Sequence, residues 1–274
     1  MAILEAKALS IAYGEKTVLE QLDLRIPPGK ITVLIGSNGC GKSTLLRTIA
    51  RLRQPSSGAI LLDGKQLSSM SSKEIARQLA MLPQGPEAPE GLTVRQLVRQ
   101  GRYPHQSWLK QWSQEDERMV KYALDATRTA EFAERSLQAL SGGQRQRAWI
   151  ALALAQGTDM LLLDEPTTYL DLTHQVDILD MLFELNEREG RTIVMVLHDL
   201  NLACRYAHHM VAVSEGGIYD EGPPEQIMTE EMVRHVFRMR CRIAEDPIFH
   251  TPYCIPEGRG RMISSETRTR EAVQ

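Results

Sequence analysis

Eight residues, Gly36 to Ser43, have the types and spacing that bind the phosphates of a nucleotide. They match G-x-x-x-x-G-K-[ST] in full, and the apolar run Ile31–Ile35 before them predicts a buried strand that leads into the loop. The glycines let backbone N–H groups turn inward around a β-phosphate, while Lys42 reaches the β- and γ-phosphates and Ser43 is a ligand for Mg²⁺. A helix expected from Ser43 to about Arg51 points its positive end at the same phosphates.

Two carboxylates follow another apolar run about 120 residues later. Leu161–Leu163 predicts a buried strand, and Asp164 and Glu165 come directly after it. Asp164 is suited to hold Mg²⁺ through water beside Ser43, and Glu165 is suited to polarise an attacking water as a general base. Two acids after a strand can also begin an ordinary loop. Together with the phosphate loop upstream, they predict hydrolysis of a nucleoside triphosphate.

The segment Ser141-Gly142-Gly143-Gln144 lies between these two motifs and precedes a predicted helix, Arg145–Ala155. Ser141 and Gln144 have capping-box spacing, so one interpretation is a helix start with no further role. The same Gly-Gly helix start exposes unpaired N–H groups and a positive dipole end, which suits a γ-phosphate.

The elements needed to position these residues can be read from apolar patterning. Residues 3–26 alternate around Gly14 as in an antiparallel hairpin, and residues 87–155 have a helical composition. The apolar strand 192–197 and the helix 173–188 predict a parallel crossover, and residues 210–213 and 217–219 predict a last strand pair. His208 and His209 are expected at a solvated helix end. These elements predict the α/β class.

Composition restricts the function further. The 274 residues are 42% hydrophobic and 24% charged, with a formal net charge of -3 and no basic run, which argues against nucleic acid as a partner. No stretch approaches the ~20 apolar residues of a membrane span, and the N-terminus lacks the pattern of a signal peptide. The chain is therefore expected in the cytosol, with any membrane contact made through a partner.

The three motifs, in this order, resemble those of the ATP-binding cassette (ABC) ATPases from Tyr13 to about Gly222. The resemblance implies a P-loop NTPase (RecA-like) core with an N-terminal antiparallel β subdomain and an inserted α-helical subdomain. The core would comprise residues 1–86 and 157–222, and the helical subdomain with the signature motif would comprise residues 87–156. Residues 223–274 would form a C-terminal extension that ends in a disordered tail.

The resemblance also implies ATP and Mg²⁺ as ligands and assigns the site residues. Tyr13 would stack on adenine, and the contacts to ATP would come from Gly36, Ser37, Asn38, Gly39, Cys40, Gly41, Lys42, Ser43 and Thr44. The catalytic residues would be Glu165, His198, Lys42 and Gln84, and the Mg²⁺ site would be formed by Ser43, Gln84 and Asp164. The ATP of the opposite subunit would be contacted in trans by Ser141, Gly142, Gly143 and Gln144. The dimer interface would be crossed by Tyr169-Leu170-Asp171, although the family often has a small residue at the position of Tyr169.

The partners implied are a second copy in an ATP-sandwich dimer, two integral-membrane permease subunits and, indirectly, a periplasmic or surface substrate-binding protein. The chain would lie peripherally on the cytoplasmic face of the inner membrane. Residues 101–105, Trp108–Asp116 and Asp164–Gln175 resemble ATPases of ferric-siderophore importers. Cobalamin, haem or another solute is the alternative cargo. A non-transport role in translation or DNA repair is more remote, because such ABC ATPases carry two cassettes or a long coiled coil.

Overall fold

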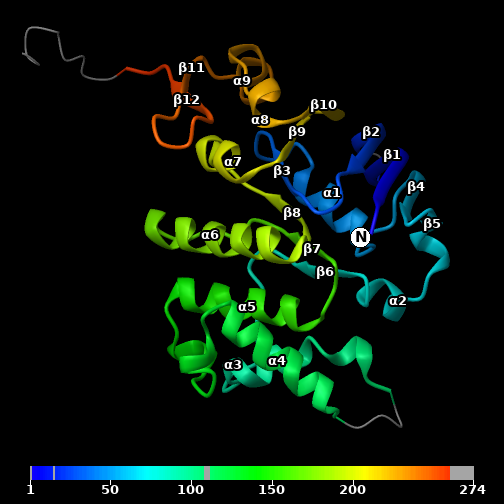
Figure 1. Cartoon of the computed structure of the whole chain (residues 1–274). Coiled ribbons are helices and arrows are strands. Elements are labelled where there is room, and N and C mark those ends of the chain that lie inside the picture. The colour runs from blue at the N-terminus through cyan, green and yellow to red at the C-terminus, as the bar shows by residue number, and fades with distance from the viewer. Residues whose placement is uncertain (1, 15, 108–111, 260–274) are drawn as a thin grey trace, which may run out of the picture.

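The computed structural model describes residues 2–14, 16–107 and 112–259 (Figure 1). A six-stranded sheet in the order β10-β9-β3-β8-β7-β6 lies at the centre of the molecule. Five of its strands run parallel, and β10 pairs antiparallel with β9 at one edge. The strands are β3 (Ile31–Ile35), β6 (Leu79–Leu82), β7 (Met160–Leu163), β8 (Thr192–Val196), β9 (His209–Ser214) and β10 (Gly217–Gly222).

The central strands are apolar along their whole length because the sheet is covered on both faces. In β7, Leu161 and Leu163 belong to one core, which the helices complete, while Met160 and Leu162 belong to a second core. The second core contains α1 (Lys42–Ile49) and the antiparallel sheet β2-β1-β4-β5. The strands of that sheet are β1 (Leu4–Tyr13), β2 (Lys16–Ile26), β4 (Ser57–Leu62) and β5 (Lys65–Gln66).

A helical layer lies on the other side of the parallel sheet, at the bottom of Figure 1. Its helices are α3 (Val94–Gln100), α4 (Gln114–Ala126) and α5 (Gly142–Ala155), with short 3₁₀ turns at Tyr103–His105, Ala130–Phe132 and Leu137–Ala139. α5 packs on both α3 and α4 and also contacts β6, so it joins the helical layer to the sheet. The short helix α2 (Ser72–Ala76) and the 3₁₀ turn Leu67–Ser69 connect β5 to β6.

The remaining elements are α6 (Leu172–Glu189), α7 (Leu200–Tyr206), α8 (Pro224–Ile227), α9 (Glu230–Phe237), β11 (Cys241–Glu245) and β12 (Pro252–Pro256). Of these, α6 lies between α5 and α7 and contacts β8, and the others come after β8 in the chain (Figure 1). β11 and β12 form an antiparallel hairpin that the sequence did not predict, and it rests on α7. The predicted tail from residue 260 onward lies outside the described residues, as does Trp108.

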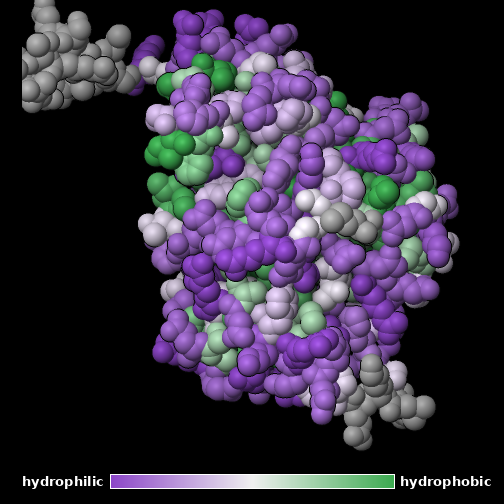
Figure 2. All heavy atoms as spheres, viewed as in Figure 1, coloured by the Kyte–Doolittle hydropathy of each residue, from purple (hydrophilic) through white to green (hydrophobic). Residues whose placement is uncertain are grey.

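The predicted α/β fold with a parallel sheet and covering helices is confirmed. The face of the molecule in Figure 2 is dominated by hydrophilic residues, with apolar residues in separate patches. Within the described part of the chain, no helix combines the length and the apolar character that crossing a bilayer requires.

Candidate nucleotide site

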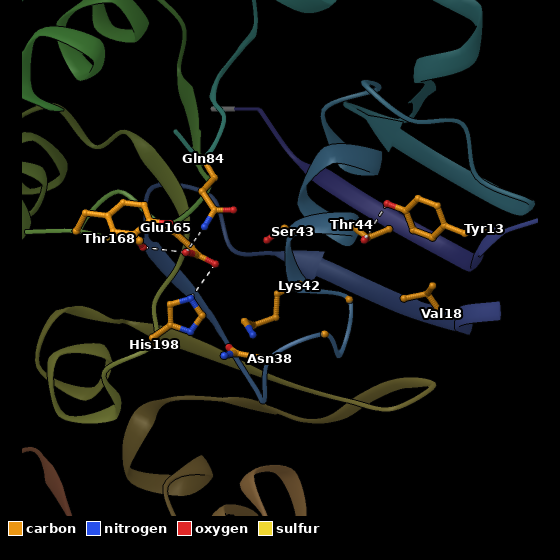
Figure 3. Close-up of a pocket in the computed structure, with 13 residues that line it drawn as sticks. Tyr13, Val18, Asn38, Lys42, Ser43, Thr44, Gln84, Glu165, Thr168 and His198 are labelled. Atoms are coloured by element: carbon orange, nitrogen blue, oxygen red, sulfur yellow. Dashed lines mark hydrogen bonds and ion pairs between the residues drawn. The ribbon is translucent and has the colours of Figure 1, made fainter. Parts of the chain in front are cut away.

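A pocket of about 480 Å³ opens where the phosphate loop meets the ends of β6, β7 and β8. Figure 3 shows Tyr13 at one end, Lys42 and Ser43 in the middle, and Gln84, Glu165 and His198 together at the other end. The pocket is lined by Tyr13, Val18, Asn38, Gly39, Gly41, Lys42, Ser43, Thr44, Gln84, Glu165, Thr168, Tyr169 and His198.

Steric limits explain the glycines of the phosphate loop. A Cβ on Gly36 would lie 2.3 Å from the carbonyl oxygen of Val213, and a Cβ on Gly41 would lie 2.9 Å from Val18. Gly41 also has a φ of +108°, a backbone conformation that residues other than glycine rarely adopt. α1 begins directly after this residue, so the loop delivers a helix N-terminus and the Lys42 ammonium to one place.

Lys42 is buried, and its ammonium donates to the carbonyl oxygens of Gly36 at 2.8 Å and Ser37 at 3.0 Å. These bonds hold the lysine across the inside of the loop. Its charge therefore faces the space that the loop encloses, where it can attract phosphate oxygens.

The carboxylate of Glu165 has three side-chain partners in the pocket. Oε1 lies 2.8 Å from Nε2 of His198, and Oε2 accepts from the amide of Gln84 at 2.6 Å and the hydroxyl of Thr168 at 2.8 Å (Figure 3). Partial burial raises the pKa of Glu165, but the hydrogen bonds from Thr168 and His198 outweigh burial and bring the pKa below its usual value. The carboxylate is therefore ionised at neutral pH and able to accept a proton.

Asp164 is 1% exposed, and one of its oxygens is already paired. Arg47 contacts Oδ2 through Nη2 at 3.2 Å and through Nε at 3.3 Å. Oδ1 is buried and has no hydrogen-bond partner among the described residues. An unpaired buried carboxylate oxygen fits Mg²⁺, which prefers carboxylate, hydroxyl and water oxygens. Asp164 and the hydroxyl of Ser43 therefore suit the predicted Mg²⁺ site.

The segment Ser141–Gln144 forms the predicted capping box at the start of α5. Gly143 is packed so closely that a Cβ would lie 2.4 Å from the ring of His174, whereas Gly142 is exposed. The residues found to line the pocket include none of these four. The exposed helix start thus lies outside the lining of this chain's own pocket.

Tyr13 ends β1, and its hydroxyl lies 3.4 Å from Oγ1 of Thr44. Tyr169 has a φ of +64° and is 93% exposed at the mouth of the same pocket. Four other predicted site residues, Gly36, Ser37, Cys40 and Asp164, are not among the residues that line the pocket.

Val18 and Thr168 line the pocket but were not predicted from the sequence. Val18 had no chemical signal, because its role is to fill space beneath Gly41. Thr168 had a usable signal, since a hydroxyl three residues after Glu165 in a turn can reach back to the carboxylate.

The comparisons with known proteins agree with this geometry. Residues 19–168 match the family model described as "ABC transporter". The chain belongs to the ABC transporter family. It is 64% identical over 263 residues to the petrobactin import ATP-binding protein FpuD of Bacillus anthracis, with 96% of each chain covered. It is 61% identical over 266 residues to YusV of Bacillus subtilis (strain 168), named a siderophore transport system ATP-binding protein, with 97% of each covered.

A solved structure gives the same result for the fold. A metal-chelate type ABC transporter in an inward-facing conformation superposes with a TM-score of 0.82 at 27% identity, over 94% of this chain and 99% of that one. The predicted resemblance to ABC ATPases and the predicted P-loop NTPase core are therefore confirmed, and the chain is an ABC-type ATPase.

Proposed function

We propose that this ABC ATPase powers the import of a ferric siderophore, with ATP hydrolysed in the pocket described above. The observation that carries the chemistry is the ionised Glu165 carboxylate, held by Gln84, Thr168 and His198 beside the phosphate loop. The cargo class rests on the names of the relatives that match nearly the whole chain.

In this mechanism, Glu165 accepts a proton from the water that attacks the γ-phosphate. Its bonds to His198 and Gln84 orient the carboxylate and place two polar side chains next to the attacking water. Lys42 and the N–H groups of the loop stabilise the charge that develops on the phosphate oxygens. Mg²⁺, held by Ser43, Asp164 and Gln84, would neutralise part of that charge.

The complete site would need two chains. The capping box pairs the backbone N–H groups of Ser141 and Gln144, and the start of α5 lies outside its own pocket. The remaining N–H groups of this first turn would bind a phosphate held elsewhere. In a face-to-face dimer that phosphate would be the γ-phosphate of the partner's ATP. Hydrolysis then removes a ligand that binds the closed state better than the open one, and the dimer opens.

The membrane partner would dock beside the segment that follows Gln84. A groove of about 320 Å³ there is lined by buried or half-buried apolar side chains and by exposed charged ones, the composition of a docking surface. It is lined by Pro86, Glu87, Ala88, Glu90, Leu137, Gln138, Arg145 and Trp149. Two permease subunits bound at these grooves would place the dimer on the cytoplasmic face of the membrane, with a substrate-binding protein acting on the other side.

Growth on single iron sources tests the cargo class. Cells that lack this chain should fail to grow on ferric siderophores as the only iron source, but should grow on an unchelated iron salt. Restoring the chain should restore growth, and restoring it with Glu165→Gln should not. Normal growth of the deletion strain on every ferric siderophore tried would overturn the cargo proposal, and a cobalamin requirement would favour the alternative.

A further inference from the structure

Tyr13 is held by two side chains from a distant part of the sequence. Its hydroxyl lies 3.4 Å from Oγ1 of Thr44, and Cζ of Arg53 lies 3.5 Å from the centre of its ring. At this distance the planar guanidinium covers one face of the ring, where the positive charge is attracted to the π electrons. Tyr13 is nevertheless 49% exposed, so its other face remains open.

Tyr13 also forms part of the wall of the nucleotide pocket, whereas Arg53 does not. Arg53 instead lines a separate cavity of about 70 Å³, together with Thr48 and Arg51. The tyrosine ring therefore stands between the guanidinium and the space that would receive a base.

A further contact fixes the backbone next to the ring. Nη2 of Arg53 donates a hydrogen bond to the carbonyl oxygen of Ala12, the residue before Tyr13. Nε of Arg53 is buried and has no hydrogen-bond partner among the described residues, although an unpaired buried N–H is unfavourable. The guanidinium is thus placed by the Tyr13 ring and by Ala12, and not by full hydrogen bonding.

We propose that Arg53 is a positioning residue for the nucleotide: it holds Tyr13 from behind so that the adenine base stacks on the open face. Guanidinium, phenol ring and base would form three parallel layers. A ring fixed before binding loses less freedom when the base stacks on it, so the contact gains affinity from preorganisation. This inference rests on the proposed nucleotide site.

Binding of ADP and of inorganic pyrophosphate to the purified full chain tests the inference. ADP carries the base, pyrophosphate lacks it, and neither requires the two-chain closed state. Arg53→Ala should weaken ADP binding about tenfold, the size of a moderate base–aromatic stacking contribution, and leave pyrophosphate binding unchanged. Arg53→Lys, which keeps the charge and loses the planar surface, should behave like Arg53→Ala. In ATPase assays, Arg53→Ala should raise KM and leave kcat unchanged.

Two further variants separate positioning from a general structural effect. Arg51→Ala removes a neighbouring guanidinium that donates to the carbonyl of Met70, and it should leave ADP binding unchanged. In a Tyr13→Leu background, Arg53→Ala should have little additional effect on ADP binding. Equal loss of ADP and pyrophosphate binding in Arg53→Ala, or an undiminished effect without Tyr13, would overturn the inference. If the unmodified chain bound neither probe, the proposed nucleotide site itself would be wrong.

Discussion

The side-chain amide of Gln84 donates a 2.6 Å hydrogen bond to Oε2 of Glu165, although the two residues are 81 positions apart in the chain. Gln84 follows β6 and begins the segment that leads to the helical layer, while Glu165 follows the adjacent strand β7. A shift of the segment after Gln84 would therefore remove a donor from the carboxylate. This bond is a direct physical route between the proposed docking groove and the hydrolytic site.

Glu165→Gln should keep ATP binding and lower the hydrolysis rate by about 10²- to 10⁴-fold, because an amide cannot accept the proton of water. The bound ATP should then trap a dimer that elutes earlier than the monomer on gel filtration. Glu131→Gln, on the exposed surface, is the control and should hydrolyse ATP normally. Normal turnover by Glu165→Gln would remove Glu165 from the role of base.

Thr168→Val removes the hydroxyl that donates to Glu165 at 2.8 Å. Because this bond lowers the pKa of Glu165, its loss should raise that pKa and move the acidic limb of the pH–rate profile to higher pH. Thr167→Val is the matched control, since the structure describes no bond from the Thr167 side chain to Glu165. A Thr168→Val profile identical to that of the unmodified chain would mean that the hydroxyl does not hold the carboxylate in solution.

Ser141→Arg should leave ADP binding to the monomer intact and block ATP-dependent dimer formation, because the bulk would stand between the start of α5 and the partner's phosphate. Ser71→Arg is a suitable control, since Ser71 forms the same kind of capping box at the start of α2. Light scattering with and without ATP measures dimer formation in the Glu165→Gln background. Loss of ADP binding by the monomer would contradict the in-trans assignment.

Asp116 should make stability depend on acid pH. Burial raises the pKa of Asp116, but the hydrogen bonds from Ser113 and from the Arg102 guanidinium outweigh burial and lower this pKa to about 2. A lowered pKa gives stability that is present above the usual pKa near 4 and lost as pH falls toward 2, in total about 2 kcal/mol. Urea unfolding should therefore show a steeper loss between pH 4 and pH 2.5 than in Asp116→Asn.

At pH 7 the same variant should lose about 3 to 5 kcal/mol, because Arg102 is only 4% exposed and would keep an unpaired charge. Glu115→Gln, which removes an exposed partner of Arg118, should change stability by less than about 1 kcal/mol. An Asp116→Asn protein as stable as the unmodified chain at pH 7 would show that the buried pair contributes little.

Long apolar runs made much of the fold predictable from sequence. The hairpin around Gly14 and the strands β3, β7 and β8 were predicted because each has a continuous or alternating apolar pattern. β6 was missed because its Leu-Ala-Met-Leu sequence has no β-branched residue, and its strand conformation comes from pairing with β7.

Tertiary contacts account for the other differences. The β11–β12 hairpin is held by Asn201, whose side chain exchanges two hydrogen bonds with the backbone of Cys254, 53 positions away. The prediction for His208 and His209 was wrong. His208 stacks on Phe183 and accepts a hydrogen bond from Ile31, and His209 begins β9. Motif spacing identified the groups that would touch phosphate, but not Thr168, Arg47 and Arg53, whose partners are set by folding.

Uptake of a radiolabelled ferric siderophore shows whether hydrolysis at Glu165 powers this import. It would be measured, with labelled cobalamin alongside, in cells whose only copy of the chain is either unmodified or Glu165→Gln. Glu165→Gln should abolish ferric-siderophore uptake and leave cobalamin uptake unchanged. Ferric-siderophore uptake at the unmodified rate in Glu165→Gln cells would contradict the claim that hydrolysis at Glu165 powers this import.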